Sequence, residues 1–184
     1  YEDKMIVGKS SIDSNVYENL VFCFRNVEKV TIPSFIRKIE SYAFQQSKVR
    51  VVDFEKNSQL QIVEDYAFSE SLIEKFTVPP HLTKIYRSVF DLCSQFKLLD
   101  ISSNCELEKI DKDAFSFSNI KSLYLPPHLT FLGFSDVSIL IVEIDENAKV
   151  ENFNQFLYSI DNDNGIIMAP KNIFELITTE EFSE

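Results

Sequence analysis

A six-residue pattern, apolar-x-x-apolar-x-apolar, recurs along this 184-residue chain and restricts its fold more than any other feature. Six copies read VEKVTI (27–32), VRVVDF (49–54), IEKFTV (73–78), FKLLDI (96–101), IKSLYL (120–125) and ILIVEI (139–144). The second apolar position recurs after 22, 24, 23, 24 and 19 residues. Such a regular interval predicts coils of similar length that stack in a line, because each copy can bury its apolar side chains only against its neighbours.

The last four positions of each copy alternate between apolar and mostly polar residues and are rich in Val, Ile, Thr and Tyr. They predict a short strand with one buried face, and the interval falls in the range of leucine-rich repeats. A second apolar pair follows each strand, and we expect a helical or 3₁₀ turn to place both members on one face. These pairs are Ile36/Ile39, Leu60/Val63, Leu82/Ile85, Leu107/Ile110 and Leu129/Leu132.

An aromatic residue, usually after a small one, follows each of the first four pairs, as in Ala43-Phe44 and Ala67-Phe68. We expect the ring to fill the space between stacked coils. Odd copies leave the strand through proline, whose missing N–H ends the ladder of hydrogen bonds. Even copies use a loop two residues longer, in which we expect an asparagine side chain to bind backbone groups. The prolines are Pro33, Pro79 and Pro126, and the asparagines are Asn57, Asn104 and Asn147.

The two ends of the chain depart from the pattern. We assign residues 1–184 to a single domain, with clear repeats over 27–158. Residues 1–26 are a degenerate N-terminal repeat with a candidate strand at 4–12, and Phe22 stands where the next repeat has Phe44. Residues 159–184 are a degenerate C-terminal repeat and cap, with a candidate seventh strand at 165–170.

Charge excludes several classes of partner. Eighteen Lys and Arg against 29 Asp and Glu give a net charge of −11, so phosphate backbones and anionic lipid surfaces are repelled and nucleic acid is not expected as a partner. The sequence has no apolar run long enough to cross a bilayer, and its N-terminal residues lack the apolar segment of a signal peptide. We therefore expect no direct membrane insertion of this segment.

The sequence offers little chemistry for catalysis or metal binding. His81 and His128 occupy the same slot after Pro-Pro in equivalent repeats, which favours a repeat-encoded loop residue over a metal pair. The run Asp161–Gly165 resembles part of a calcium loop, but the glutamate that such a loop needs is missing, which favours a polar turn. No motif of a hydrolase, metalloprotease or nucleotide-binding loop is present. We expect no enzyme activity, no catalytic residue, no metal site and no cofactor.

The three cysteines, Cys23, Cys93 and Cys105, have no short paired spacing and form an odd number. This count favours buried free thiols over a zinc site or a complete disulfide framework. A bridge between Cys93 and Cys105 remains the alternative in an exported chain.

The string VTIPSFIRKIESYAF (30–44), with its echoes VPPHLTKIYRSVF and LEKIDKDAF, resembles the BspA-like leucine-rich repeats of bacterial and protist surface proteins, in particular the trichomonad type. The resemblance covers about residues 27–170. It implies a right-handed solenoid with a parallel β-sheet on the concave face, to which the pattern adds short helical or 3₁₀ turns and loops on the convex face. It also implies a cell-surface or secreted location and adhesion to host cells, matrix or neighbouring cells.

Parallel stacking would align the polar positions of the strands in rows across the concave sheet. A central row would hold Thr31, Asp53, Thr77, Asp100, Tyr124 and Glu143. An adjoining row would hold Lys29, Val51, Lys75, Leu98, Ser122 and Ile141, and an outer row Glu28, Arg50, Glu74, Lys97, Lys121 and Leu140.

Bare aliphatic side chains are unusual on a solvated strand face, so Val51, Leu98, Leu140, Ile141 and Tyr124 suggest a partly apolar binding patch. A loop or a further repeat that covers them is the alternative. The candidate binding residues are Thr31, Val51, Asp53, Thr77, Leu98, Asp100, Tyr124, Leu140, Ile141 and Glu143.

These features favour a non-enzymatic protein-recognition domain that binds a host or cell-surface protein through the concave sheet. Two alternatives share the same sequence features. One is a structural spacer or self-association module, and the other is an intracellular leucine-rich-repeat scaffold.

Overall fold

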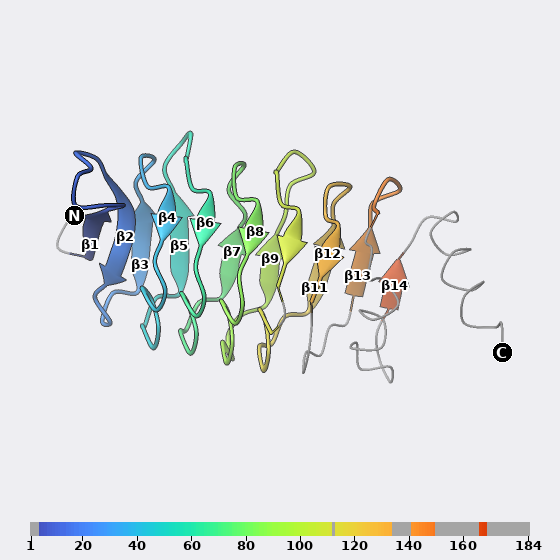
Figure 1. Cartoon of the computed structure of the whole chain (residues 1–184). Helices are drawn as coiled ribbons and strands as arrows, with labels where there is room; N and C mark the ends of the chain where they lie inside the picture. Colours follow the sequence, from blue (N-terminus) through green and yellow to red (C-terminus); the bar gives the residue numbers. More distant parts are fainter. Residues whose placement is uncertain (1–3, 112, 134–140, 150–165, 169–184) are drawn as a thin grey trace.

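The computed structural model describes residues 4–111, 113–133, 141–149 and 166–168, and its coils stack in sequence order along one axis (Figure 1). From β2 to β13 the strands alternate between two sheets, which we call sheet A and sheet B. Sheet A has the order β1-β2-β4-β6-β8-β10-β12, and sheet B has the order β14-β13-β11-β9-β7-β5-β3. The predicted repeat solenoid with a parallel sheet is therefore confirmed.

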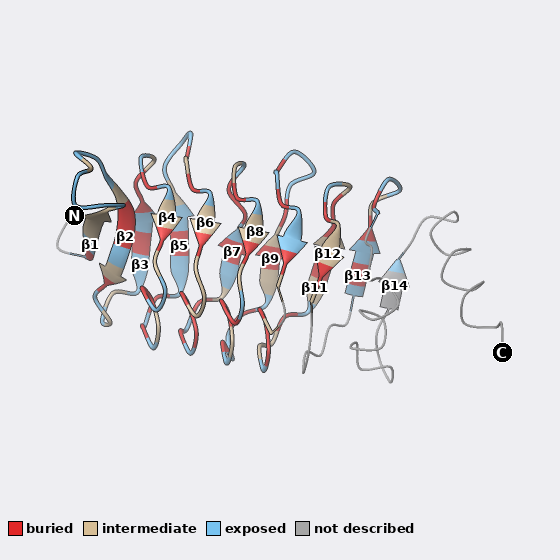
Figure 2. Ribbon diagram, viewed as in Figure 1, coloured by how far each residue is buried: buried red, intermediate tan, exposed pale blue. Residues whose placement is uncertain are grey.

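Sheet B is built from the six-residue pattern. Its strands are β3 (Lys29–Ile32), β5 (Val51–Phe54), β7 (Lys75–Thr77), β9 (Leu98–Asp100), β11 (Ser122–Leu125), β13 (Ile141–Ile144) and β14 (Ile166–Met168). All neighbours pair in parallel, and the second apolar position of each copy is at most 5% exposed. Buried and exposed residues alternate along these strands, as Figure 2 shows. The alternation leaves one face of sheet B on the core and the other open.

Sheet A replaces the expected helical turns. Its regular strands have two residues each: β4 (Lys38–Ile39), β6 (Ile62–Val63), β8 (Lys84–Ile85), β10 (Lys109–Ile110) and β12 (Phe131–Leu132). Both members of each apolar pair are buried, as predicted. The prediction of a helical or 3₁₀ turn was wrong for the described residues. Coils stacked at strand spacing offer backbone partners across the stack, as in Ile39↔Val63 and Val63↔Ile85, so the backbone needs no hydrogen bonds within a helical turn.

The small-aromatic segments form a third side of each coil. Phe44, Phe68, Phe90 and Phe115 are fully buried and stack along the axis, with centroid distances of 4.5, 5.6 and 5.3 Å. In the first three of these residues the N–H donates to the carbonyl before the next ring, from Phe44 to Ala67 (2.7 Å), from Phe68 to Val89 (2.9 Å) and from Phe90 to Ala114 (2.7 Å). The expectation that the rings fill the space between coils is confirmed.

The asparagine loops use a different hydrogen bond from the one expected. In two of them the backbone N–H of the asparagine is the donor, from Asn104 to Ser102 Oγ (3.2 Å) and from Asn147 to Asp145 Oδ1 (2.9 Å). In the third, Asn57 adopts a φ of 63°, a conformation that asparagine tolerates better than most residues.

An antiparallel hairpin forms the N-terminal end of sheet A. It consists of β1 (Met5–Lys9) and β2 (Tyr17–Cys23), and β2 pairs in parallel with β4. Gly8 is needed where these strands meet, because a Cβ there would lie 2.6 Å from the Val21 side chain. The candidate strand at 4–12 thus exists, but it lies in sheet A rather than in the row of pattern strands.

The hairpin also corrects the alignment of Phe22 with Phe44. The N–H of Cys23 donates to the Ala43 carbonyl (2.9 Å), which is the bond that Phe44 makes to Ala67 one coil later. Cys23 is fully buried, whereas Phe22 is half-buried. Cys23 therefore holds the aromatic position, and the first coil is shorter than the sequence alignment assumed.

The predicted strand at 165–170 is present as β14, which pairs with β13. The polar run 161–165 lies outside the described residues, as does the rest of the C-terminal cap.

All three cysteines are buried and free, so the alternative of a Cys93–Cys105 bridge is excluded here. Burial raises the pKa of the Cys93 thiol to about 12 and that of Cys23 to about 11. The Cys93 thiol donates to the Phe68 carbonyl (3.0 Å) and so joins two neighbouring coils in the core. Among the described residues, no helix reaches the length and hydrophobicity that crossing a bilayer requires.

Candidate binding face

The open side of sheet B, here called the B face, carries the predicted rows. The adjoining row is continuous, because Lys29↔Val51, Val51↔Lys75, Lys75↔Leu98, Leu98↔Ser122 and Ser122↔Ile141 are all registered pairs. In the central row the registered pairs are Thr31↔Asp53, Thr77↔Asp100 and Tyr124↔Glu143. Of the predicted candidates only Leu140 lies outside the described residues.

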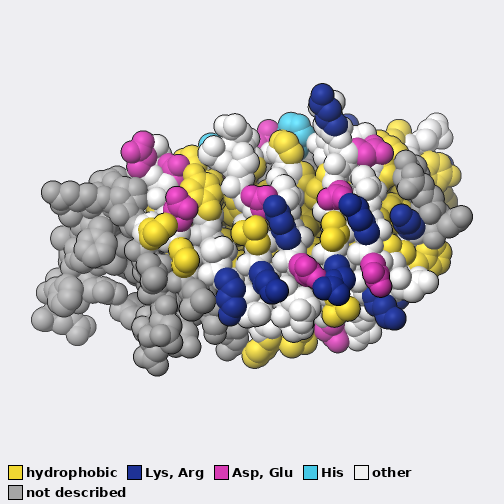
Figure 3. Space-filling view, turned by 180° about the vertical axis from the view of Figure 1, so that it is seen from behind, with side chains coloured by type: hydrophobic (Ala, Val, Ile, Leu, Met, Phe, Trp, Pro, Cys, Tyr) yellow, Lys and Arg dark blue, Asp and Glu magenta, His cyan; other side chains and the backbone are white. Residues whose placement is uncertain are grey.

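The part of the B face nearer the N-terminus is charged and internally paired. Lys29 binds Asp53 (Nζ–Oδ2 2.9 Å), and Lys75 binds Asp100 (2.6 Å). Thr77 also donates to Asp100 (3.3 Å). Figure 3 shows basic and acidic side chains side by side over this part of the molecule. The candidates Asp53, Thr77 and Asp100 therefore have their polar groups paired within this solvated surface, and Thr31 lies beside Asp53 in the row. Each exposed ion pair contributes less than about 1 kcal/mol.

The part nearer the C-terminus is apolar. Ile141 on β13 is 39% exposed, and Met168 on β14 is 50% exposed. Leu98 is half-buried and lies in the same row as Ile141, two coils away with Ser122 between them. Hydrophobic side chains also gather on this part of the face in Figure 3. We call Leu98, Ile141 and Met168 the apolar patch.

Val51 is 41% exposed, but it stands apart from this patch. Its neighbours in the row are Lys29 and Lys75, both exposed and both paired with carboxylates. An isolated exposed valine of this kind needs no ligand to explain it.

Tyr124 is tied into the structure more than the sequence indicated. Its side chain is half-buried against the core, and its hydroxyl donates to Asp145 Oδ2 (2.8 Å). Desolvation, followed by the bond to Asp145 and its charge, raises the pKa of Tyr124 to about 12. Tyr124 therefore lies beside the apolar patch with its side chain held in place by Asp145 and the core.

Two residues at this end of the face were not among the candidates. Met168 was missed because the altered spacing of the last strand hid its register with Glu143. Asp145 was missed because it lies in the loop after β13, where only a side-chain contact shows its role.

The histidines lie in loops between coils. His81 Nδ1 lies 3.1 Å from Glu106 Oε1, and His128 Nε2 donates to the Ser103 carbonyl (2.9 Å). Both contacts join neighbouring coils, which agrees with a repeat-encoded role. No group of three or more metal-ligating side chains occurs in the described part of the chain.

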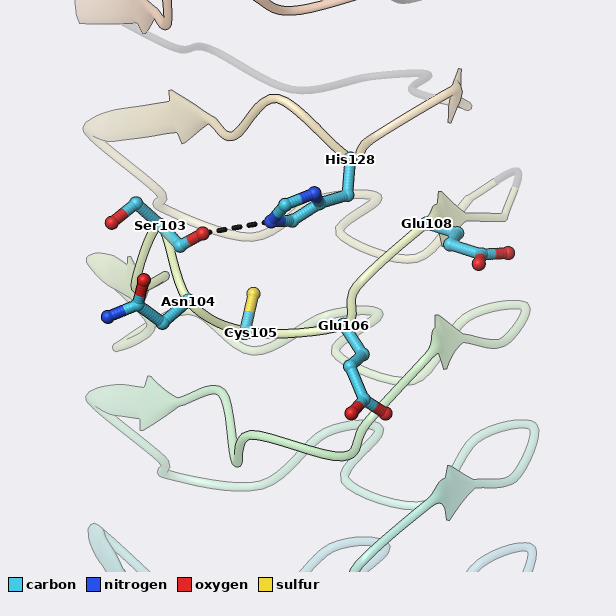
Figure 4. A pocket seen from close by; sticks show the side chains of 6 residues that line it. All are labelled: Ser103, Asn104, Cys105, Glu106, Glu108 and His128. Carbon is cyan, nitrogen blue, oxygen red and sulfur yellow. Dashed lines mark hydrogen bonds between the residues drawn. The ribbon is translucent and has the colours of Figure 1, made fainter.

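A shallow groove beside His128 has few groups that could react (Figure 4). It is lined by Ser103, Asn104, Cys105, Glu106, Glu108 and His128. Burial raises the pKa of the Cys105 thiol, so the thiolate that a nucleophilic cysteine needs is disfavoured at neutral pH. The histidine ring bonds to a backbone carbonyl and not to a side chain that it could activate. The groove is thus a gap between two loops, and its one thiol is held in the protonated form.

Comparison with known proteins agrees with the geometry. The family model for the BspA type leucine-rich repeat region matches residues 10–138 in six copies. The crystal structure of the pneumococcal vaccine antigen PcpA is similar with a TM-score of 0.62 and 35% identity, over 65% of this chain and 31% of that one. The chain thus spans about a third of the length of that structure.

A second solved structure has the same fold. The leucine-rich repeat protein TpLRR of T. pallidum has a TM-score of 0.54 and 15% identity, and the match covers 88% of this chain and 85% of that one. No curated protein matches the chain.

Proposed function

We propose, since this chain belongs to the family with the BspA type leucine-rich repeat region, that it is a non-enzymatic protein-recognition domain. Leucine-rich-repeat solenoids offer extended sheet surfaces to protein partners. The partner binds the B face at the apolar patch. The domain works at the cell surface or after secretion, in adhesion to host cells, matrix or neighbouring cells.

The observation that carries this proposal is the contrast within one face. Four of the strands, from β3 to β9, satisfy their outward charges among themselves, whereas β13 and β14 leave Ile141 and Met168 open to water. Protein interfaces hold an apolar centre within a charged rim. A surface location is supported by the family and by the likeness to a vaccine antigen, since antibodies act on exposed proteins.

The matched test uses two substitutions of the same type in the same row. The double variant Leu98→Asp/Ile141→Asp places two carboxylates in the apolar patch. The control Val51→Asp places one carboxylate between lysines, at a side chain about as exposed as Ile141. Binding of the fluorescently labelled domain to candidate host cells is measured by flow cytometry. The double variant should lose binding, while Val51→Asp should keep it and all three proteins should melt alike.

Equal binding by the wild type and the double variant would refute the patch as the site. Surface labelling of intact cells of the source organism tests the location separately, and a domain that is never labelled would favour the intracellular scaffold.

Self-association is a second candidate, and the β1–β2 hairpin favours it. Ile12 at its tip is 95% exposed, and Val16 and Tyr17 are more than half exposed. Such a group of apolar residues suits contact with another copy. Light scattering across concentrations would show a dimer that Ile12→Asp converts to a monomer; a monomer at all concentrations would remove this candidate.

A further inference from the structure

The outer row of the B face has a regular charge sequence that breaks at the apolar patch. Backbone hydrogen bonds link its members, from Arg50 N to Glu28 O (2.8 Å), Glu74 N to Arg50 O (3.1 Å), Lys97 N to Glu74 O (2.9 Å) and Lys121 N to Lys97 O (3.1 Å). The row therefore reads acidic, basic, acidic, basic, basic. Figure 3 shows basic and acidic side chains following one another across this face.

Two members of the row are paired within the protein, since Arg50 Nε donates to Glu74 Oε1 (2.7 Å). Lys97 and Lys121 are exposed, and neither forms an ion pair with any residue that the structure describes. Like charges side by side on neighbouring strands destabilise a sheet. Acidic residues outnumber basic ones by 29 to 18 in this chain, so an unpaired lysine pair is not a matter of missing acids.

The lysine pair borders the apolar patch. Lys97 precedes Leu98 in the chain, Lys121 precedes Ser122, and the Lys121 carbonyl accepts a bond from Ile141 N (3.1 Å). On the opposite border lie Glu143, which is exposed, and Asp145, which holds the Tyr124 hydroxyl. The patch thus runs between a basic margin and an acidic margin.

We propose that Lys97 and Lys121 bind carboxylates of the protein partner, which presents acidic side chains next to apolar ones. This inference rests on the function proposed above and adds the chemistry of its partner. A lysine ammonium beside an apolar contact steers and orients an acidic segment. Nucleic acid and anionic membranes are disfavoured as the source of the anion, because the acidic margin and the net charge of −11 repel a polyanion.

The experiment selects random linear peptides, displayed on phage, on the immobilised full chain. We expect the wild type to enrich peptides with Asp or Glu beside apolar residues. The double variant Lys97→Glu/Lys121→Glu should not enrich them, and should favour peptides with Lys or Arg instead. An enriched acidic peptide should bind this variant at least about tenfold more weakly than the wild type, because like charges then meet across the interface.

A second double variant, Lys56→Glu/Lys109→Glu, is the matched control. It changes the net charge equally at two exposed lysines, in a loop and on sheet A. It should select and bind the same peptides as the wild type. Thermal melts check that all variants are folded.

The outcomes separate this inference from the proposed function. Peptides that depend on Leu98 and Ile141 but carry no acidic preference, or bind Lys97→Glu/Lys121→Glu equally well, would overturn the lysine role alone. Enrichment that survives Leu98→Asp/Ile141→Asp, or no enrichment at all, would overturn the binding face together with its partner chemistry.

Discussion

At the scale of single residues, the turns around the aromatic stack hold ordinary side chains in the left-handed region. Positive φ values recur at two positions of each turn. They are 54–63° at Tyr42, Tyr66, Ser88 and Asp113, and 53–57° at Gln46, Glu70, Leu92 and Phe117. The stack itself fixes this backbone, because the Gln46 N–H donates to Ser69 and the Leu92 N–H to Ser116 in the next coil. Nothing in the sequence indicated the left-handed conformation, because none of these positions holds glycine or asparagine. The strain is visible only once neighbouring coils are in place.

Leu92 and Leu72 test this strain as a matched pair. Both are exposed leucines, 49% and 39%, but only Leu92 has a positive φ. Glycine relieves the strain at Leu92, about 1 kcal/mol, and only adds chain entropy at Leu72. Leu72→Gly should therefore melt about 2–4 °C below Leu92→Gly in calorimetry. Equal melting temperatures would show that the left-handed turn stores no strain.

At the scale of elements, the sequence predicted the strands of sheet B and missed the two-residue strands of sheet A. The pattern copies alternate over four positions, as in VTI at 30–32, and that period is a strand signal in any context. Two-residue strands such as Lys38–Ile39 are too short to show a period. They exist because an equivalent pair lies one coil away, which is tertiary information. The aromatic stack was predictable because a ring recurs once per coil.

The stack should be most sensitive at its centre. Phe90 contacts four rings, those of Phe68, Phe76, Phe96 and Phe115, with centroid distances of 4.5–5.6 Å. Within the part of the chain that the structure describes, Phe44 stacks on the Phe68 ring alone. Phe→Ala in a core costs about 3–5 kcal/mol, and each aromatic pair adds about 0.5–1.5 kcal/mol. Phe90→Ala should thus lower the free energy of unfolding in urea by about 1 kcal/mol or more beyond Phe44→Ala. Equal losses for the two variants would mean that the additional ring contacts of Phe90 contribute nothing.

At the scale of the whole molecule, a stack of coils needs its ends covered, because each coil contacts only its neighbours. The rows of the B face followed from the repeat alone, and the apolar side chains Leu98 and Ile141 were predicted with them. The pairing that sorts the face into a satisfied half and an open half could not be predicted, because it depends on rotamers of Lys29, Arg50 and Lys75. The alignment of Phe22 with Phe44 in the first coil was wrong, because the pairing of β2 with β1 and β4 places Cys23 at that position.

The hairpin is the N-terminal cover of sheet A and of the aromatic stack. Met5, Leu20 and Cys23 are at most 2% exposed, and Cys23 occupies the ring position next to Phe44. Deleting residues 1–23 would return Phe44 to water and remove this burial, about 1.5–3 kcal/mol for each large apolar side chain. The deletion variant should melt well below the full chain, and should bind a hydrophobic dye at lower temperature. Ile12→Asp alters the same hairpin at an exposed tip and should melt like the wild type. If the deletion variant also melted like the wild type, the hairpin would be an appendage, and the stack would have to be stable with its first coil open.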